Sequence, residues 1–182
     1  MDSPEYIRPV KPAAPVKYLT AITFKDSKRL VEATAALESQ YGEIDHVSPV
    51  YMFDYSNYYE DEMGSGLQKQ LVSFRDLQKI EDFVKLKFFN MELEFEYSRA
   101  GKRQVNIDPA YLELAKLVVA TTKNYDHRVY LGHGIYADVQ LRFRNDQFVA
   151  NDWTYRDYQS PVVLDFLKIV RATYFRQLKR RT

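Results

Sequence analysis

The chain has 182 residues, of which 46% are hydrophobic and 28% are charged, and its formal net charge is +1. This length suits one domain with a substantial core, and this composition excludes wholesale disorder. There is no cysteine, which excludes disulfides, zinc–thiolate sites, iron–sulfur clusters and thiol catalysis. The near-neutral charge argues against broad electrostatic capture of nucleic acid or of an anionic membrane.

No apolar run reaches the roughly eighteen residues that a membrane-spanning helix needs. The N-terminus begins acidic and is interrupted by prolines, unlike a signal peptide. We therefore expect a cytoplasmic protein that engages neither a membrane nor nucleic acid, and a homo-oligomer is left open. Residues 1–15 are predicted to be an extended proline-rich arm, followed by one domain over residues 16–182.

The first part of that domain shows alternating strand and helix patterns. β-Branched and aromatic residues predict strands at 16–24, 44–53, 67–74 and 104–107. Between them, apolar residues at helical spacing predict two helices capped by Asp26 and Asp76. The second helix is predicted to bury Leu77, Ile80, Val84, Phe88, Met91 and Phe95. The resulting β-α-β-β-α-β order predicts an α+β fold with a ferredoxin-like unit.

The last third of the chain extends this unit. Strands are predicted at 117–121, 128–131, 135–143 and 148–149, joined by turns into an antiparallel meander. A terminal helix over 160–179 is predicted from Ser160 as its cap and Pro161 at its first position.

Three polar blocks are candidates for a site, and the first is the acidic loop 58–64. Its tyrosines precede Glu62, a carboxylate that could act as an acid or base or bind a hard cation. The alternative is a solvated connecting loop, because no spacing here matches a known metal-binding loop.

The second block is 101–109. Lys102 and Arg103 follow Gly101, an arrangement that suits an anion because Arg forks onto phosphate or carboxylate. Asn106 and Asp108 then share one face of a strand, and Asp108 is a second acid–base candidate. Asp108 could equally cap a turn before the proline that follows it.

The third block, 116–138, concentrates positive charge. Its predicted ligand-binding residues are Lys116, Thr122, Lys123, Arg128, Tyr136 and Asp138. His127 could move protons because its reference pKa lies near neutrality, although a histidine beside an arginine is commonly a surface residue. Asp138 also fits a half-exposed strand. A fourth stretch, WTYRDY at 153–158, is predicted either to line a pocket or to plug the end of the core.

Several known motifs are absent, including the P-loop GxxxxGK[ST], GxGxxG after a strand, HExxH and GxSxG. The segments YYEDEMG (58–64), GKRQVNIDPAYL (101–112), KLVVATTK (116–123), HRVYLGHGIYADVQL (127–141) and WTYRDY (153–158) resemble the signature blocks of a bacterial family, domain of unknown function 4416. Members are often labelled GTP-binding proteins, a label that the missing P-loop does not support here. The resemblance implies that the polar blocks form a common site.

Two functional hypotheses follow. In the first, the domain holds a phosphorylated or carboxylated small molecule against a positive wall, while Glu62, Asp108 and Asp138 orient it or a magnesium-like cation. No other cofactor is evident. In the second, the chain is a non-catalytic module that contacts a protein or RNA. The hypotheses differ in geometry, since only the first requires the blocks 58–64, 101–108 and 116–138 to converge on one hollow.

Overall fold

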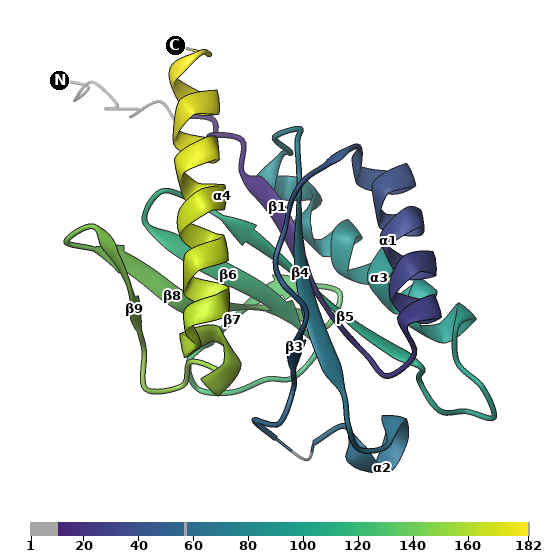
Figure 1. Ribbon diagram of the computed structural model, residues 1–182. Helices are drawn as coiled ribbons and strands as arrows, with labels where there is room; N and C mark the ends of the chain where they lie inside the picture. Colours follow the sequence, from purple (N-terminus) through teal and green to yellow (C-terminus); the bar gives the residue numbers. More distant parts are fainter. Residues whose placement is uncertain (1–10, 57, 182) are drawn as a thin grey trace, which may run out of the picture.

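The computed structural model describes residues 11–56 and 58–181 of the chain, and its described residues form one nine-stranded sheet with helices on both faces (Figure 1). The strand order is β2-β4-β1-β5-β6-β8-β7, with β3 paired to β4 and β9 paired to β8. The strands are β1 Lys17–Phe24, β2 Ile44–Val47, β3 Tyr51–Met52, β4 Gln68–Phe74, β5 Val105–Leu112, β6 Lys116–Thr121, β7 Arg128–Gly132, β8 Ile135–Arg144 and β9 Gln147–Ala150. The helices are α1 Ser27–Tyr41, α2 Glu60–Met63, α3 Phe83–Glu96 and α4 Pro161–Lys179, with 3₁₀ turns η1 Ile80–Asp82 and η2 Arg156–Gln159.

The predicted α+β class and most predicted elements are confirmed. Asp26 caps α1 through its side chain, Ser160 caps α4, and Pro161 opens α4 as expected. Neighbouring strands pair antiparallel, and β1 and β5 lie side by side in the same sheet. The ferredoxin-like description of residues 17–112 stays a prediction. So does the proline-rich arm predicted over residues 1–15, because residues 1–10 lie outside the described part of the chain.

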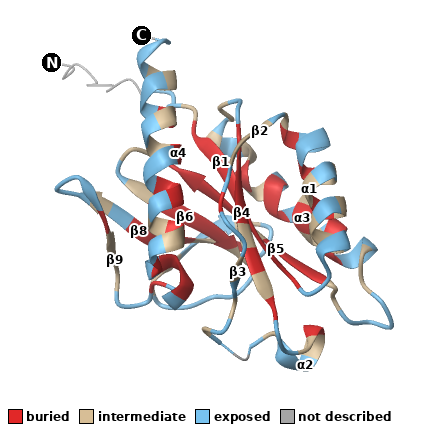
Figure 2. Cartoon of the chain, viewed as in Figure 1, coloured by how far each residue is buried: buried red, intermediate tan, exposed pale blue. Residues whose placement is uncertain are grey.

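Each face of the sheet has its own apolar core. Helices α1 and α3 cover the face that carries Tyr18, Ile22 and Phe24, whereas α4 covers the face that carries Leu19 and Ala21. The alternation along β1 follows from the two-residue repeat of a strand. Figure 2 shows the result, with buried residues along the sheet and on the inward sides of the helices.

Two details of the prediction are wrong. Helix α3 begins at Phe83 rather than after Asp76, and it leaves Phe88 and Phe95 exposed by 38% and 82%. The helix carries apolar residues on all of its sides, so their spacing does not identify the buried face. The residues that are buried are Phe83, Leu86, Lys87, Asn90, Leu93 and Glu94. The second error is the meander. Strand β8 lies between β6 and β7, because the β7–β8 hairpin docks on β6 through its second strand.

The sheet divides between β5 and β6. These strands pair only from Ala110↔Val119 to Leu112↔Leu117 in the described chain. Residues 105–109 continue along β1, while residues 120–121 continue along β8. The two strands thus separate at one end of the sheet and form a fork.

None of the helices in residues 11–56 and 58–181 is long and apolar enough to cross a membrane.

Candidate functional site

Two adjoining hollows, with volumes of about 380 and 180 Å³, lie at the fork. They share Tyr58, Tyr59, Asp108, Lys123 and Tyr155. The larger hollow is otherwise lined by Phe53, Tyr55, Ser56, Lys69, Tyr125, Arg128, Trp153, Thr154, Arg156 and Asp157. The smaller is otherwise lined by Lys87, Arg103, Asn106, Val119, Ala120, Thr121 and Thr122. Loops and strands far apart in the sequence therefore meet in one place.

Polar residues reach the hollows because the α4 face of the sheet changes composition at this end. Thr23 of β1 is paired with Lys69 on one side and with Asn106 on the other, so the three side chains share a face. Asp108 lies two residues further along β5 on that face. Side chains on this one face of the sheet are therefore apolar under α4 and polar beyond the N-terminus of α4.

Arg103 is fixed by Glu62, an acid of helix α2. Its Nε and Nη2 donate to Glu62 Oε1 and Oε2 at 2.8 and 2.6 Å, a bidentate pair. Its Nη1 donates to Asn106 Oδ1 at 2.8 Å, and Asn106 Nδ2 donates to Asp108 Oδ2 at 2.8 Å. The hydrogen bonds from Arg103 lower the pKa of Glu62, and Glu62 in turn raises the pKa of Arg103. Glu62 therefore orients a cation and is not a free acid or base.

Helix α3 supplies polar groups from the opposite face of the sheet. Lys87 Nζ lies 3.8 Å from Asp108 Oδ1, and Glu94 Oε1 accepts a hydrogen bond from the Ile107 N–H at 2.6 Å. β6 does not pair with β5 at Ile107, so the Glu94 carboxylate accepts the hydrogen bond that a neighbouring strand would otherwise accept from the Ile107 N–H. Burial raises the pKa of the Glu94 carboxyl. Lys87 and Glu94 thus stabilise the fork from beneath.

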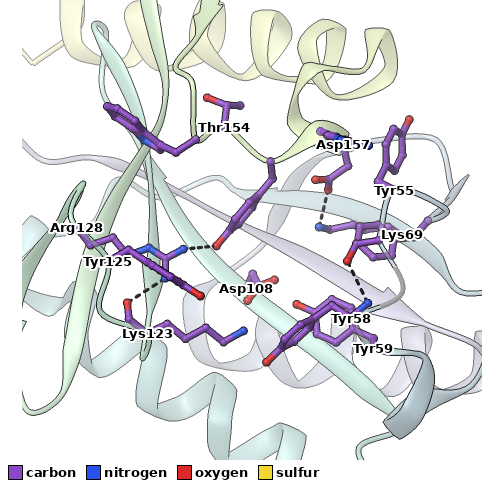
Figure 3. A pocket seen from close by; sticks show the side chains of 15 residues that line it. Tyr55, Tyr58, Tyr59, Lys69, Asp108, Lys123, Tyr125, Arg128, Thr154 and Asp157 are labelled. Carbon is purple, nitrogen blue, oxygen red and sulfur yellow. Dashed lines mark hydrogen bonds and ion pairs between the residues drawn. The ribbon is translucent and has the colours of Figure 1, made fainter.

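Lys123 lies where the two hollows meet. Its Nζ is 3.6 Å from the centre of the Tyr58 ring, a cation–π contact that Figure 3 shows at the mouth of the larger hollow. Within the described residues, Lys123 forms no ion pair with a carboxylate. Its backbone N–H donates to Thr121 Oγ1 at 3.2 Å, which helps to hold the turn after β6.

Arg128 is held from behind by a buried carboxylate. Its Nε donates to Asp138 Oδ2 at 2.7 Å, and Asp138 is fully buried. Its Nη2 donates to the Tyr155 hydroxyl at 2.9 Å and its Nη1 to the Lys123 carbonyl at 3.0 Å. Burial raises the pKa of Tyr155 to about 12, so this phenol stays protonated at neutral pH. Asp138 positions Arg128 and does not itself line either hollow.

A second buried pair closes the other side of the larger hollow. Lys69 Nζ lies 2.7 Å from Asp157 Oδ2, with both side chains almost fully buried. The ammonium also lies over the rings of Phe53 and Tyr158, at 4.9 and 5.3 Å from their centres. Neither Lys69 nor Asp157 is among the residues that the sequence predicted. One lysine within an alternating strand gives no signal, but the carboxylate of WTYRDY could have been paired with it.

The predicted site residues fall into three groups. Six line the hollows: Arg103, Asn106, Asp108, Thr122, Lys123 and Arg128. Glu62 and Asp138 stand behind two of the cations. Four others lie elsewhere: Lys102, Lys116, His127 and Tyr136.

The four outlying residues have local partners of their own. Lys102 Nζ donates to the Asp61 carbonyl, and Lys116 pairs with Glu113 at the opposite end of β6. His127 is stacked between Tyr125 and Trp153, and its Nε2 lies 3.4 Å from Asp138 Oδ2. Tyr136 packs against Tyr130 on the β7–β8 hairpin. Two of the predicted plug residues, Trp153 and Tyr155, line the larger hollow instead, whereas Tyr158 is fully buried.

No group of three or more histidine, aspartate or glutamate residues that could hold a metal ion occurs in the part of the chain that the structure describes. The groups that line the hollows are cations, carboxylates, hydroxyls, amides and aromatic rings.

The fold and the hollows define an α+β domain with a cationic, aromatic crevice at a split sheet. Residues 14–174 match the family described as "Domain of unknown function (DUF4416)", so the chain belongs to that family. Comparisons with curated proteins and with solved structures found no match.

Proposed function

We propose that the forked end of the sheet binds a small anionic molecule, phosphorylated or carboxylated, in the two adjoining hollows. The observation that carries this proposal is the charge of the lining at the junction. Six cations line the hollows, namely Lys69, Lys87, Arg103, Lys123, Arg128 and Arg156, against two lining carboxylates, Asp108 and Asp157. The excess is local, because the whole chain carries only +1.

The arrangement of these cations supports an anion site over a plain network of ion pairs. Four of them have carboxylate partners that fix their positions, as Glu62 fixes Arg103 and Asp138 fixes Arg128. Lys123 has no such partner in the described chain, and it lies where both hollows open. Like charges held this close repel one another, and a bound anion offsets that repulsion. Pre-fixed donors also lower the entropic cost of binding.

The test compares two lysines near opposite ends of β6. Lys123→Ala removes the unpaired cation just beyond the end of β6, whereas Lys116→Ala removes a surface lysine at the start of the same strand and serves as the control. Thermal unfolding is followed with inorganic phosphate, pyrophosphate or citrate at constant ionic strength, with and without Mg²⁺. An anion at about 100 times its Kd stabilises the native state by about 2.7 kcal/mol.

We expect the wild type and Lys116→Ala to respond alike, and Lys123→Ala to lose most of the response while remaining as stable as the wild type without ligand. A wild type that responds to none of the anions, or an equal response in both variants, would contradict the proposal and favour the interaction module. The Mg²⁺ arm tests the predicted divalent cation.

A cytoplasmic location, a bacterial origin and the absence of membrane or nucleic-acid partners also belong to this proposal. They rest on the lack of cysteine, the near-neutral charge and the resemblance of the sequence blocks.

A further inference from the structure

We infer that the anion carries a planar ring and that the ligand is a free mononucleotide, with its ring in the larger hollow and its phosphate in the smaller one. This inference rests on the proposed anion site and specifies its ligand. It follows from how differently the two hollows are lined.

The larger hollow is walled by aromatic rings. Seven of its 15 lining residues are aromatic: Phe53, Tyr55, Tyr58, Tyr59, Tyr125, Trp153 and Tyr155. Tyr58 and Tyr125 are 58% and 56% exposed, so part of each side chain is open to solvent. Its volume of about 380 Å³ lies in the range of small-molecule sites. Base rings stack on such side chains regardless of their sequence identity, because every base has a π-face.

Contacts within the protein hold several of these rings in place. Tyr125, His127 and Trp153 form a parallel stack, with centres 6.0 and 4.9 Å apart and planes within 2° and 15° of parallel. Trp153 Nε1 donates to the Val139 carbonyl at 3.0 Å, which anchors one end of the stack. The Arg128 guanidinium lies 4.6 Å from the centre of the Tyr125 ring and braces the other. Rings fixed in this way lose little freedom on binding.

The smaller hollow offers the donors that phosphate takes. Lys87, Arg103 and Lys123 supply positive charge, while Asn106, Thr121 and Thr122 supply amide and hydroxyl groups. Its volume of about 180 Å³ and its polar walls suit a phosphate better than a ring. The hollows share Tyr58 and Lys123, so a molecule with a ring and a phosphate at its two ends can occupy both.

The contact between Lys123 and Tyr58 couples the two halves of the ligand. The Lys123 ammonium lies over the Tyr58 ring, 3.6 Å from its centre (Figure 3). A phosphate that draws Lys123 into the smaller hollow would release the face of that ring for stacking. Phosphate and ring should therefore bind more tightly together than their separate contacts suggest.

The test uses ligands that differ only in the ring. Calorimetry measures the affinity of the wild type for mononucleotides of the four common bases, for ribose 5-phosphate and for inorganic phosphate. Trp153, the only tryptophan of the chain, reports through its fluorescence whether a ring enters the larger hollow. We expect mononucleotides to bind about 5- to 150-fold more tightly than ribose 5-phosphate, the equivalent of ~1–3 kcal/mol of stacking, and to quench Trp153.

Two tyrosines of equal exposure make the matched variants. Tyr58→Leu should bring the affinity for mononucleotides close to that for ribose 5-phosphate, while Tyr130→Leu, at a residue of β7 that lines neither hollow, should change neither. Equal affinities of the wild type for mononucleotides and ribose 5-phosphate would overturn the ring inference and leave the anion site intact. A short oligonucleotide that binds more tightly than any mononucleotide would overturn the free-nucleotide ligand. Failure of every phosphate compound would instead contradict the proposed function itself.

Discussion

The face of the sheet that α4 covers differs sharply between its two halves. Beneath α4, strands β1, β5 and β6 present Leu19, Ala110 and Leu117, and all are fully buried. Beyond the N-terminus of α4, the same strands present Thr23, Asn106 and Thr121. The strands are continuous and the alternation is unbroken, so the difference lies only in which residue types occupy the face.

The comparison shows where this chain departs from what stability alone requires. Apolar residues of similar volume would stabilise the fork by burial, and replacing buried ion pairs with them is often neutral or favourable. The chain instead keeps the buried pairs Lys69–Asp157 and Arg128–Asp138 there. The proposed anion binding would account for this polar half, and the predictions below test that contrast.

The largest effect is expected at the buried carboxylate behind Arg128. Asp138→Asn leaves the guanidinium, whose side chain is 4% exposed, without its counter-charge, and this should lower the free energy of unfolding by about 3–5 kcal/mol. Asp126→Asn is the control, because the Asp126 side chain is 99% exposed and should matter by about 0.5 kcal/mol or less. Urea unfolding at neutral pH measures both changes.

A double variant separates charge from function at the same place. Arg128→Met with Asp138→Leu removes both charges and should recover much of the stability that Asp138→Asn loses. It should not recover the response to anions. A double variant that stays as unstable as Asp138→Asn would show that the pair matters for packing more than for charge.

The apolar half should respond like an ordinary core. Leu167 of α4 is fully buried, so Leu167→Ala should cost about 2–5 kcal/mol through lost burial and the cavity left behind. Ile169→Ala on the same helix is the control, since Ile169 is 55% exposed and its truncation should cost little. Leu167→Ala should bind anions normally once folded. A loss of anion binding in the folded variant would show that the two halves are not independent.

The sequence predicts this contrast only in part. The β-branched and aromatic residues of β1 and the caps of α1 and α4 are local signals, and the structure confirms these three elements. The buried face of α3 could not be predicted, because Phe88 and Phe95 compete with Leu86 and Leu93 at equivalent spacing. The buried face also carries Lys87 and Glu94, whose contacts with Asp108 and Ile107 are tertiary and leave no signal in the spacing.

The candidate site shows the same limit. Arg103, Asp108, Lys123 and Arg128 were predicted because they cluster along the chain. Lys69 was missed because it reaches the hollow through sheet pairing, and its partner lies 88 residues away. Lys116 was predicted because it is close to Lys123 in sequence, but it lies outside the hollows. The extended strand β6 separates the two lysines in space. Long-range pairing, and above all the insertion of β8 beside β6, is what the sequence does not reveal.

The smallest effect is expected from the acid that orients Arg103, and it should depend on pH. Three hydrogen bonds from Arg103, two from its guanidinium and one from its backbone N–H, hold the pKa of Glu62 below its ordinary value. A carboxyl whose pKa is lower in the folded state contributes stability above its unfolded pKa of about 4.3, and that contribution disappears as the pH falls through the folded pKa. Glu62→Gln should therefore be less stable than the wild type at pH 7, and the difference should shrink below about pH 4. Glu113→Gln is the control, because Glu113 has similar exposure but pairs with one surface lysine. Denaturant unfolding from neutral to acidic pH measures the difference for each variant. A gap that is the same at both ends of this range would mean that Glu62 acts through packing alone, and Arg103 would then need no carboxylate to face the hollow.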